Sequence, residues 1–224
     1  MGNGRYRLVG KLGYGGYSTI WLARDLQRAK TGSEIIPPLI DEFWAVGPNG
    51  KHRCLVTPPA QMGLFDAKEA STFGLFHRRW RGRISLSLFA GWPSYRVKAL
   101  YTAVCELGNI LVQFPDSIDS YSPSELYEKY GDPDPEAVVR LDGTPLSTNV
   151  PEQVFMPSWY GIPSNEIPLG QERIVLSDFG ESFNPHRTSR FSSKTLPLLQ
   201  PPEARFSNAP LSFSSDIWTL ACNI

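Results

Sequence analysis

Residues 5–25 read RYRLVGKLGYGGYSTIWLARD, and the fold prediction depends on this stretch. Residues 5–12 alternate in polarity, and residues 18–24 are rich in β-branched and aromatic residues, so each is predicted to form a strand. The sequence GYGG at 13–16 predicts a hairpin with a glycine-rich tip. Glycines at such a tip let backbone N–H groups approach phosphates closely. A Rossmann loop is excluded, because it requires a helix after the glycines.

The residues that follow predict more antiparallel β structure and then a helix. GPNG at 47–50 is a strong turn signal between an apolar stretch at 35–46 and a returning strand at 51–57. Residues 1–60 are therefore predicted to form a small antiparallel β unit. A helix is predicted over 66–76, with Asp66 as its N-cap.

The second part of the chain alternates short apolar runs with proline- and serine-rich sequence. Strands are predicted at 109–114 and 173–177, and a helix is predicted at 123–130. The strand at 173–177 is followed by Asp178, and a carboxylate at a strand end is well placed to hold Mg²⁺. The apolar stretch at 215–224 predicts a helix with an acid near its N-terminus, which suits the helix dipole.

Composition limits the function classes. The chain has 224 residues, 22 Lys+Arg and 22 Asp+Glu, and 41% hydrophobic residues, which predicts one globular domain with two lobes. Zero net charge argues against a nucleic-acid or membrane-surface partner, and no apolar run approaches the ~20 residues of a membrane span. The three cysteines are widely spaced, which indicates a reducing compartment, cytoplasmic or nuclear, and neither a disulfide scaffold nor a zinc site.

Four motifs stand in the order found in protein kinases: the glycine-rich hairpin, DFG, PPE in place of APE, and an Asp-x-Trp helix. The chain resembles the eukaryotic protein kinases, and within them the serine/arginine-rich-protein (SR-protein) kinases. The matching stretches are NGRYRLVGKLGYGGYSTIWLARD (3–25), HRCLVTPPA (52–60), LGNILVQF (107–114), LSDFGES (176–182), QPPEARF (200–206) and LSFSSDIWTLAC (211–222).

The resemblance implies an α+β, two-lobe protein-kinase-like fold that is incomplete in both lobes. The upper lobe would span 1–60, without its third strand and helix C, and the lower lobe would span 61–224. Residues 115–170 would be a Pro/Ser-rich insert of the lower lobe. Without the third strand, two strand edges are exposed, so we expect a poorly stable upper lobe.

The resemblance also implies a set of site residues. It implies ATP and Mg²⁺ as cofactors and serines of Arg/Ser-rich proteins as substrates. The implied nucleotide contacts are Gly13, Tyr14, Gly15, Gly16, Ser18 and Ile20, with the Pro58 carbonyl and Ala60 N–H at the hinge and Thr57 as gatekeeper. The implied metal ligands are Asn109 and Asp178, the activation segment includes Asp178, Phe179, Gly180 and Glu203, and Asp216 is structural.

Two residues that kinase chemistry requires are missing. There is no third-strand lysine, because Lys30 lies in a linker, and Glu34 is expected to be a solvated loop acid. Val104 occupies the catalytic aspartate position, and valine cannot accept a proton from a substrate hydroxyl. Glu106 lies two residues further along and is not expected to replace it. No catalytic residue is therefore expected to be intact.

Three alternatives stay open: a catalytically impaired kinase, a pseudokinase that acts as a binding or scaffold module, and the non-functional product of a mis-spliced or frame-shifted gene. The Arg- and Trp-rich stretch 77–98 has a rival interpretation as a basic RNA-binding segment, but no fold motif supports it.

Overall fold

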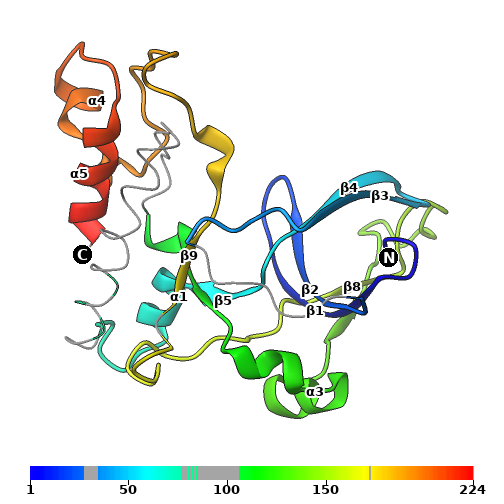
Figure 1. Cartoon of the computed structure of the whole chain (residues 1–224). Helices are drawn as coiled ribbons and strands as arrows, with labels where there is room; N and C mark the ends of the chain where they lie inside the picture. The colour runs from blue at the N-terminus through cyan, green and yellow to red at the C-terminus, as the bar shows by residue number, and fades with distance from the viewer. Residues whose placement is uncertain are drawn as a thin grey trace. The chain divides into compact units, whose positions relative to one another are not determined.

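The computed structural model describes residues 1–27, 35–76, 80, 82, 84, 106–171 and 173–223, and these are shown in Figure 1. The chain forms two compact units. Unit 1 comprises Met1–Gly32, Pro38–Pro59 and Phe114–Tyr160, and unit 2 comprises Ser33–Pro37, Ala60–Gln113 and Gly161–Ile224. Phe114–Tyr160 groups with the N-terminal hairpins in unit 1, whereas the family resemblance implies that 115–170 belongs to the lower lobe.

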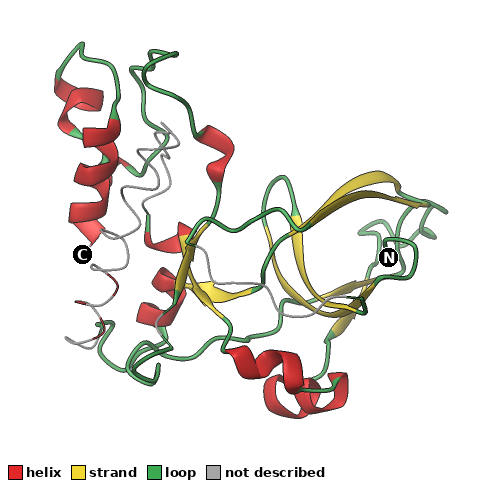
Figure 2. Ribbon diagram, in the orientation of Figure 1, coloured by secondary structure: helices red, strands yellow, loops and turns green. Residues whose placement is uncertain are grey.

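Unit 1 contains three antiparallel two-stranded sheets (Figure 2). They are formed by β1 (Tyr6–Tyr14) with β2 (Thr19–Asp25), β3 (Asp41–Gly47) with β4 (Gly50–Val56), and β7 (Pro135–Ala137) with β8 (Gln153–Phe155). The predicted glycine-rich hairpin is confirmed, since β1 pairs with β2 up to Tyr14 and Thr19. The predicted turn at 47–50 is confirmed as well, since Gly47 pairs with Gly50.

The N-terminal hairpins are joined by side chains at their base. The Arg5 guanidinium pairs with Asp25 at 2.7 Å and with Asp41 at 3.0 Å. The Tyr6 hydroxyl donates to Asp41 at 2.7 Å, and its ring stacks on Phe43 at a centroid distance of 5.5 Å. Burial and the hydrogen bond to Asp41 raise the pKa of Tyr6 to about 12. The same hydrogen bond is the main cause of the lowered pKa of the Asp41 carboxyl.

A 3₁₀ turn, η2 (Asp116–Ser120), and the helix α3 (Pro123–Tyr130) complete unit 1. The predicted helix at 123–130 is confirmed with the same bounds, because its start is fixed locally. Ser122 accepts the Glu125 N–H, and the Glu125 carboxylate accepts the Ser122 N–H, which makes a capping box. The unit has its own buried core, made of Val9, Leu22, Phe114, Ile118, Leu126 and Tyr160.

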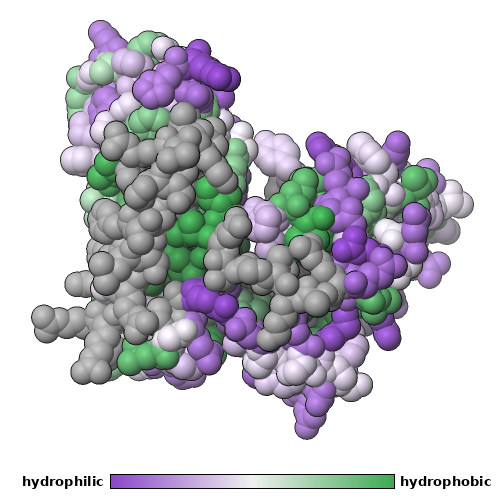
Figure 3. Space-filling model, viewed as in Figure 1, coloured by the Kyte–Doolittle hydropathy of each residue, from purple (hydrophilic) through white to green (hydrophobic). Residues whose placement is uncertain are grey.

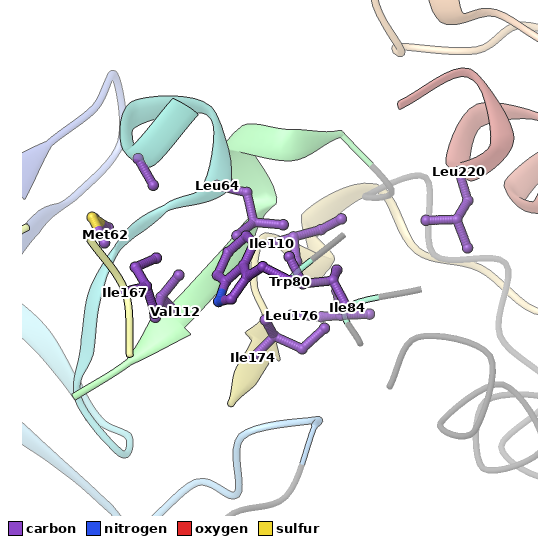
Figure 4. Close-up of a cluster of buried hydrophobic side chains, with 11 residues drawn as sticks. Met62, Leu64, Trp80, Ile84, Ile110, Val112, Ile167, Ile174, Leu176 and Leu220 are labelled. Atoms are coloured by element: carbon purple, nitrogen blue, oxygen red, sulfur yellow. The ribbon is translucent and has the colours of Figure 1, made fainter. Parts of the chain in front are cut away.

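Unit 2 is built around the three-stranded antiparallel sheet β5-β6-β9. Its strands are β5 (Ala60–Gly63), β6 (Ile110–Gln113) and β9 (Ile174–Leu176). Within its described residues, the helices and 3₁₀ turns are α1 (Leu64–Glu69), η1 (Leu107–Asn109), η3 (Phe179–Glu181), η4 (Pro197–Leu199), α4 (Pro202–Phe206) and α5 (Phe213–Asn223). The buried cluster in Figure 4 includes Leu64, Ile110, Val112, Leu176 and Leu220, with Trp80 at 1% exposure.

The predicted helix at 66–76 is wrong in both bounds. Strand β5 runs directly into α1, so Gly63 is the N-cap and Asp66 lies in the first turn. The helix ends at Glu69 because the Ser71 hydroxyl forms competing local hydrogen bonds. It donates to the Lys68 carbonyl at 2.7 Å and accepts the Leu75 N–H at 3.1 Å.

The surface carries large apolar side chains as well as polar ones, as the mixed colours of Figure 3 show. In unit 1 these include Trp44, Val46 and Leu55 on the second hairpin. Among the helices described, none is long and apolar enough to cross a membrane.

Candidate functional site

The tip of the β1–β2 hairpin in unit 1 is open to an incoming ligand. The Gly15 N–H donates to the Ser18 carbonyl at 2.8 Å and closes the turn, while Gly13 pairs with Ile20 and Tyr14 with Thr19. A Cβ built on the glycines at 13, 15 or 16 would meet nothing within 4 Å, and none of the three has a positive φ. Neither packing nor backbone strain therefore requires glycine at these three positions, and their backbone is open to close approach.

The Asp178 carboxylate lies in unit 2, directly after β9. Its backbone is left-handed, with φ 58° and ψ 61°, a conformation that few non-glycine residues adopt. The residue is exposed, and within the described part of the chain its carboxylate makes no hydrogen bond or ion pair. Strain of this kind is concentrated at functional sites, and here it holds a carboxylate that is available to a ligand.

Asn109 ends η1 and is bonded through its main chain to the strand end that carries Asp178. The Asn109 carbonyl accepts the Ser177 N–H at 2.9 Å and the Ser177 hydroxyl at 3.0 Å. The amide of Asn109 and the carboxylate of Asp178 therefore extend from neighbouring stretches of chain. Carboxylate and amide oxygens are the donors that Mg²⁺ prefers, so the donor set fits this ion. Among the described residues, no group of three or more His, Cys, Asp and Glu could hold a metal.

Glu106 joins the same turn to the segment that follows Asp178. Its carbonyl accepts the Asn109 N–H at 2.9 Å, and its carboxylate accepts the Leu196 N–H at 2.9 Å. Nothing in the sequence indicates this second bond, because its partner lies 90 residues further along the chain.

The remaining predicted site residues of unit 2 have structural contacts. Ala60 begins β5 and pairs with Gln113, and Phe179 packs against the buried core. The Glu203 carboxylate accepts a hydrogen bond from the Ser215 hydroxyl, which anchors α4 to the start of α5. Asp216 is 2% exposed in the first turn of α5, and its structural role stays a prediction.

Other predicted residues are exposed or lie outside the description. Thr57 is exposed and Pro58 is partly buried, immediately before β5. Gly180 lies within η3, next to the Asp178 carboxylate. Lys30, Glu34 and Val104 lie outside the described residues.

The fold is that of a protein kinase domain, as predicted. A kinase domain of known crystal structure superposes with a TM-score of 0.64 at 15% identity, covering 99% of this chain and 63% of that chain. The α+β class and the incomplete kinase architecture are thereby confirmed.

The sequence is similar to serine/threonine protein kinases over part of its length. Such kinases from two strains of Aspergillus fumigatus are 31% identical over a 90-residue alignment that covers 27% of this chain. The alignment spans 23% of those relatives. No family model matches the chain. These similarities support the kinase part of the predicted resemblance, and the SR-protein branch stays a prediction.

Proposed function

We propose that this chain is a kinase-like protein that binds a magnesium–nucleotide complex and does not transfer phosphate by the kinase mechanism. The observation that carries the proposal is Asp178, an exposed residue with a left-handed backbone on a kinase fold. It follows Ser177, which is hydrogen-bonded to the Asn109 carbonyl. Bound Mg²⁺ would neutralise charge on the nucleotide phosphates, and Asp178 and Asn109 would hold it. Within unit 1, the open glycine tip at 13–16 is by itself a second candidate contact for phosphates, through its backbone N–H groups.

The inactivity part of the proposal rests on the sequence. A hydroxyl acceptor needs a carboxylate to orient it and take its proton, and Val104 offers none. The Glu106 carboxylate is already bonded to the Leu196 N–H, which argues against it as a replacement. The family resemblance supports Arg/Ser-rich proteins as partners, bound by a pseudokinase rather than phosphorylated. The alternative is a gene product that folds without binding nucleotide.

A thermal-shift experiment on the full chain tests nucleotide binding. We expect MgATP to raise the melting temperature, because a ligand at ~100 times its Kd adds about 2.7 kcal/mol to stability. Asp178→Asn should lose this shift. Asp132→Asn should keep it, since Asp132 is an exposed carboxylate in unit 1 without a partner among the described residues. No shift in the unmodified chain would overturn the binding proposal.

A phosphotransfer assay with an Arg/Ser peptide tests the inactivity part. We expect no incorporation of labelled phosphate above the buffer control. Incorporation that Asp178→Ala abolishes would show that the chain is an active kinase.

A further inference from the structure

The segment Phe114–Tyr160, called the insert below, packs against the glycine-rich hairpin within unit 1. Val9 of β1 and Leu22 of β2 are 4% and 6% exposed, and they share one buried cluster with residues of the insert. Those residues are Phe114, Ile118, Leu126 and Tyr160, all at most 9% exposed. The insert therefore provides most of the apolar core beneath the hairpin.

Polar contacts attach the insert to the backbone of β1. The Tyr127 hydroxyl donates to the Val9 carbonyl at 3.1 Å. The Ser158 N–H donates to the Lys11 carbonyl at 3.0 Å, and the Lys11 ammonium donates to the Phe155 carbonyl at 2.8 Å. Two of these bonds are accepted by backbone carbonyls of β1 and the third is donated by a β1 side chain, so the insert covers part of this strand.

A second set of contacts attaches the insert to β2. The Arg24 guanidinium donates to the Asp119 carbonyl at 3.3 Å and also to the Tyr121 carbonyl. The Trp21 ring meets the Phe155 ring edge-on at 6.4 Å. Both strands are thus held by the insert within a few residues of the tip at 13–18.

An isolated two-stranded hairpin is marginally stable in water, and among the described residues β1 and β2 pair only with each other. Beyond the contacts of Arg5 and Tyr6 at its base, the hairpin therefore depends on the insert for a fixed shape. A loop that binds phosphate through backbone N–H groups binds more tightly when its shape is fixed in advance.

We propose that the insert is the element that positions the glycine-rich tip for nucleotide, with Tyr127 and Tyr160 as positioning residues. The part of this inference that concerns nucleotide affinity rests on the proposed nucleotide binding. The part that concerns the order of the hairpin does not, because that order can be measured without a ligand.

The test uses the full chain and two readouts. Hydrogen exchange of the amides at 8–14 and 19–24 measures hairpin order without nucleotide, and a titration with MgATP measures Kd. Tyr127→Phe removes one hydroxyl and should preserve the fold, whereas Tyr160→Ala removes a buried ring. Leu141→Ala is the control, since Leu141 is a fully exposed residue of the insert.

We expect Tyr127→Phe to speed exchange in the hairpin several-fold and to raise the Kd for MgATP by about the same factor. Tyr160→Ala should increase both the exchange rate and the Kd by about tenfold or more, and Leu141→Ala should change neither quantity. Unchanged exchange in the hairpin of Tyr127→Phe and Tyr160→Ala would overturn the inference. If the unmodified chain binds no MgATP, the proposed function fails, and the exchange readout still decides whether the insert orders the hairpin.

Discussion

Gly10 lies against the Tyr160 side chain in unit 1, and this contact leaves no room for a larger residue. A Cβ built on Gly10 would overlap the Tyr160 hydroxyl oxygen and would lie 3.1 Å from the ring carbon that carries it. Gly10 has no positive φ, so the constraint is one of space and not of backbone conformation. Adding one methyl group at this position, as in Gly10→Ala, therefore tests how tightly the insert packs against β1.

Gly10→Ala is expected to destabilise unit 1 by about 1–3 kcal/mol, the usual cost of overpacking a core. Urea unfolding measures the loss in the free energy of unfolding, and hydrogen exchange of the β1 and β2 amides shows whether the hairpin is affected. Combining it with Tyr160→Phe should restore part of the stability, because the overlapping oxygen is removed. Gly13→Ala is the matched control, since nothing lies within 4 Å of its built Cβ. Equal losses for the two alanine variants would contradict the packing explanation.

The carboxylate of Glu106 forms one specific hydrogen bond, to the Leu196 N–H, and this bond can be tested by itself. Glu106→Ala should increase exchange of the Leu196 amide by about tenfold, because the net value of one such bond is about 1.4 kcal/mol. Glu106→Gln retains an acceptor oxygen, so it should restore most of the protection. Equal exchange in the unmodified chain and in Glu106→Ala would show that the bond does not protect this amide.

Helix α3 starts at a capping box, and its stability depends on that cap. Ser122→Ala removes the acceptor for the Glu125 N–H and should lower the free energy of unfolding of unit 1 by about 1 kcal/mol. Circular dichroism during urea denaturation measures the change. Ser124→Ala changes an exposed serine of the same helix that is not part of the capping box, and it should leave stability nearly unchanged.

The hydrogen bond between Tyr6 and Asp41, which joins the two hairpins of unit 1, is expected to be sensitive to acid. The folded state lowers the pKa of Asp41, chiefly through the Tyr6 hydrogen bond, so the unfolded chain binds more protons in acid. The contact therefore adds stability above about pH 4, and this stability is lost as the pH falls through the folded pKa. At the alkaline end this stability is lost as the pH rises through the raised pKa of Tyr6, about 12.

Comparing Tyr6→Phe with the unmodified chain across pH tests this contact. The stability difference should be constant between about pH 5 and 9 and should shrink below about pH 4. A difference that stays constant to about pH 2 would show that the hydrogen bond to Asp41 does not cause it.

The elements that were predictable from sequence are those with local determinants. Helix α3 carries its capping box within four residues, and the hairpins carry their turn signals between the strands. Helix α1 was predicted with the wrong bounds because tertiary pairing of β5 sets its start. The motif around Asp178 was found from sequence, but its left-handed backbone was not, since only the surrounding structure imposes that strain.

The packing of the insert was not predictable, because its partners are distant in sequence. Tyr127 bonds to Val9 across 118 residues, and Lys11 bonds to Phe155 across 144. Periodicity identifies which residues of the insert are apolar, but it does not identify which surface they cover. The family resemblance implies exposed strand edges where the third strand is missing. The insert was not expected to contact β1, and its bonds to β1 cover part of that strand.

At the scale of the whole molecule, the two units are expected to differ in stability. The buried cluster of unit 2 is larger and surrounds a three-stranded sheet, whereas unit 1 has two-stranded sheets and a smaller cluster. Amides of β6 should therefore exchange more slowly than those of β1 and β2. Native-state exchange on the full chain measures both sets together. Slower exchange in β1 and β2 than in β6 would contradict the prediction.

The contribution of the insert to unit 1 has a consequence for biosynthesis. The ribosome produces the N-terminal hairpin early, but Tyr160 leaves the exit tunnel far later, on the order of ten seconds at roughly 5–20 residues per second. During that interval Val9 and Leu22 lack most of the core that later buries them. The nascent hairpin is therefore a natural client for chaperones, and codon choice between positions 25 and 160 sets the length of its exposure.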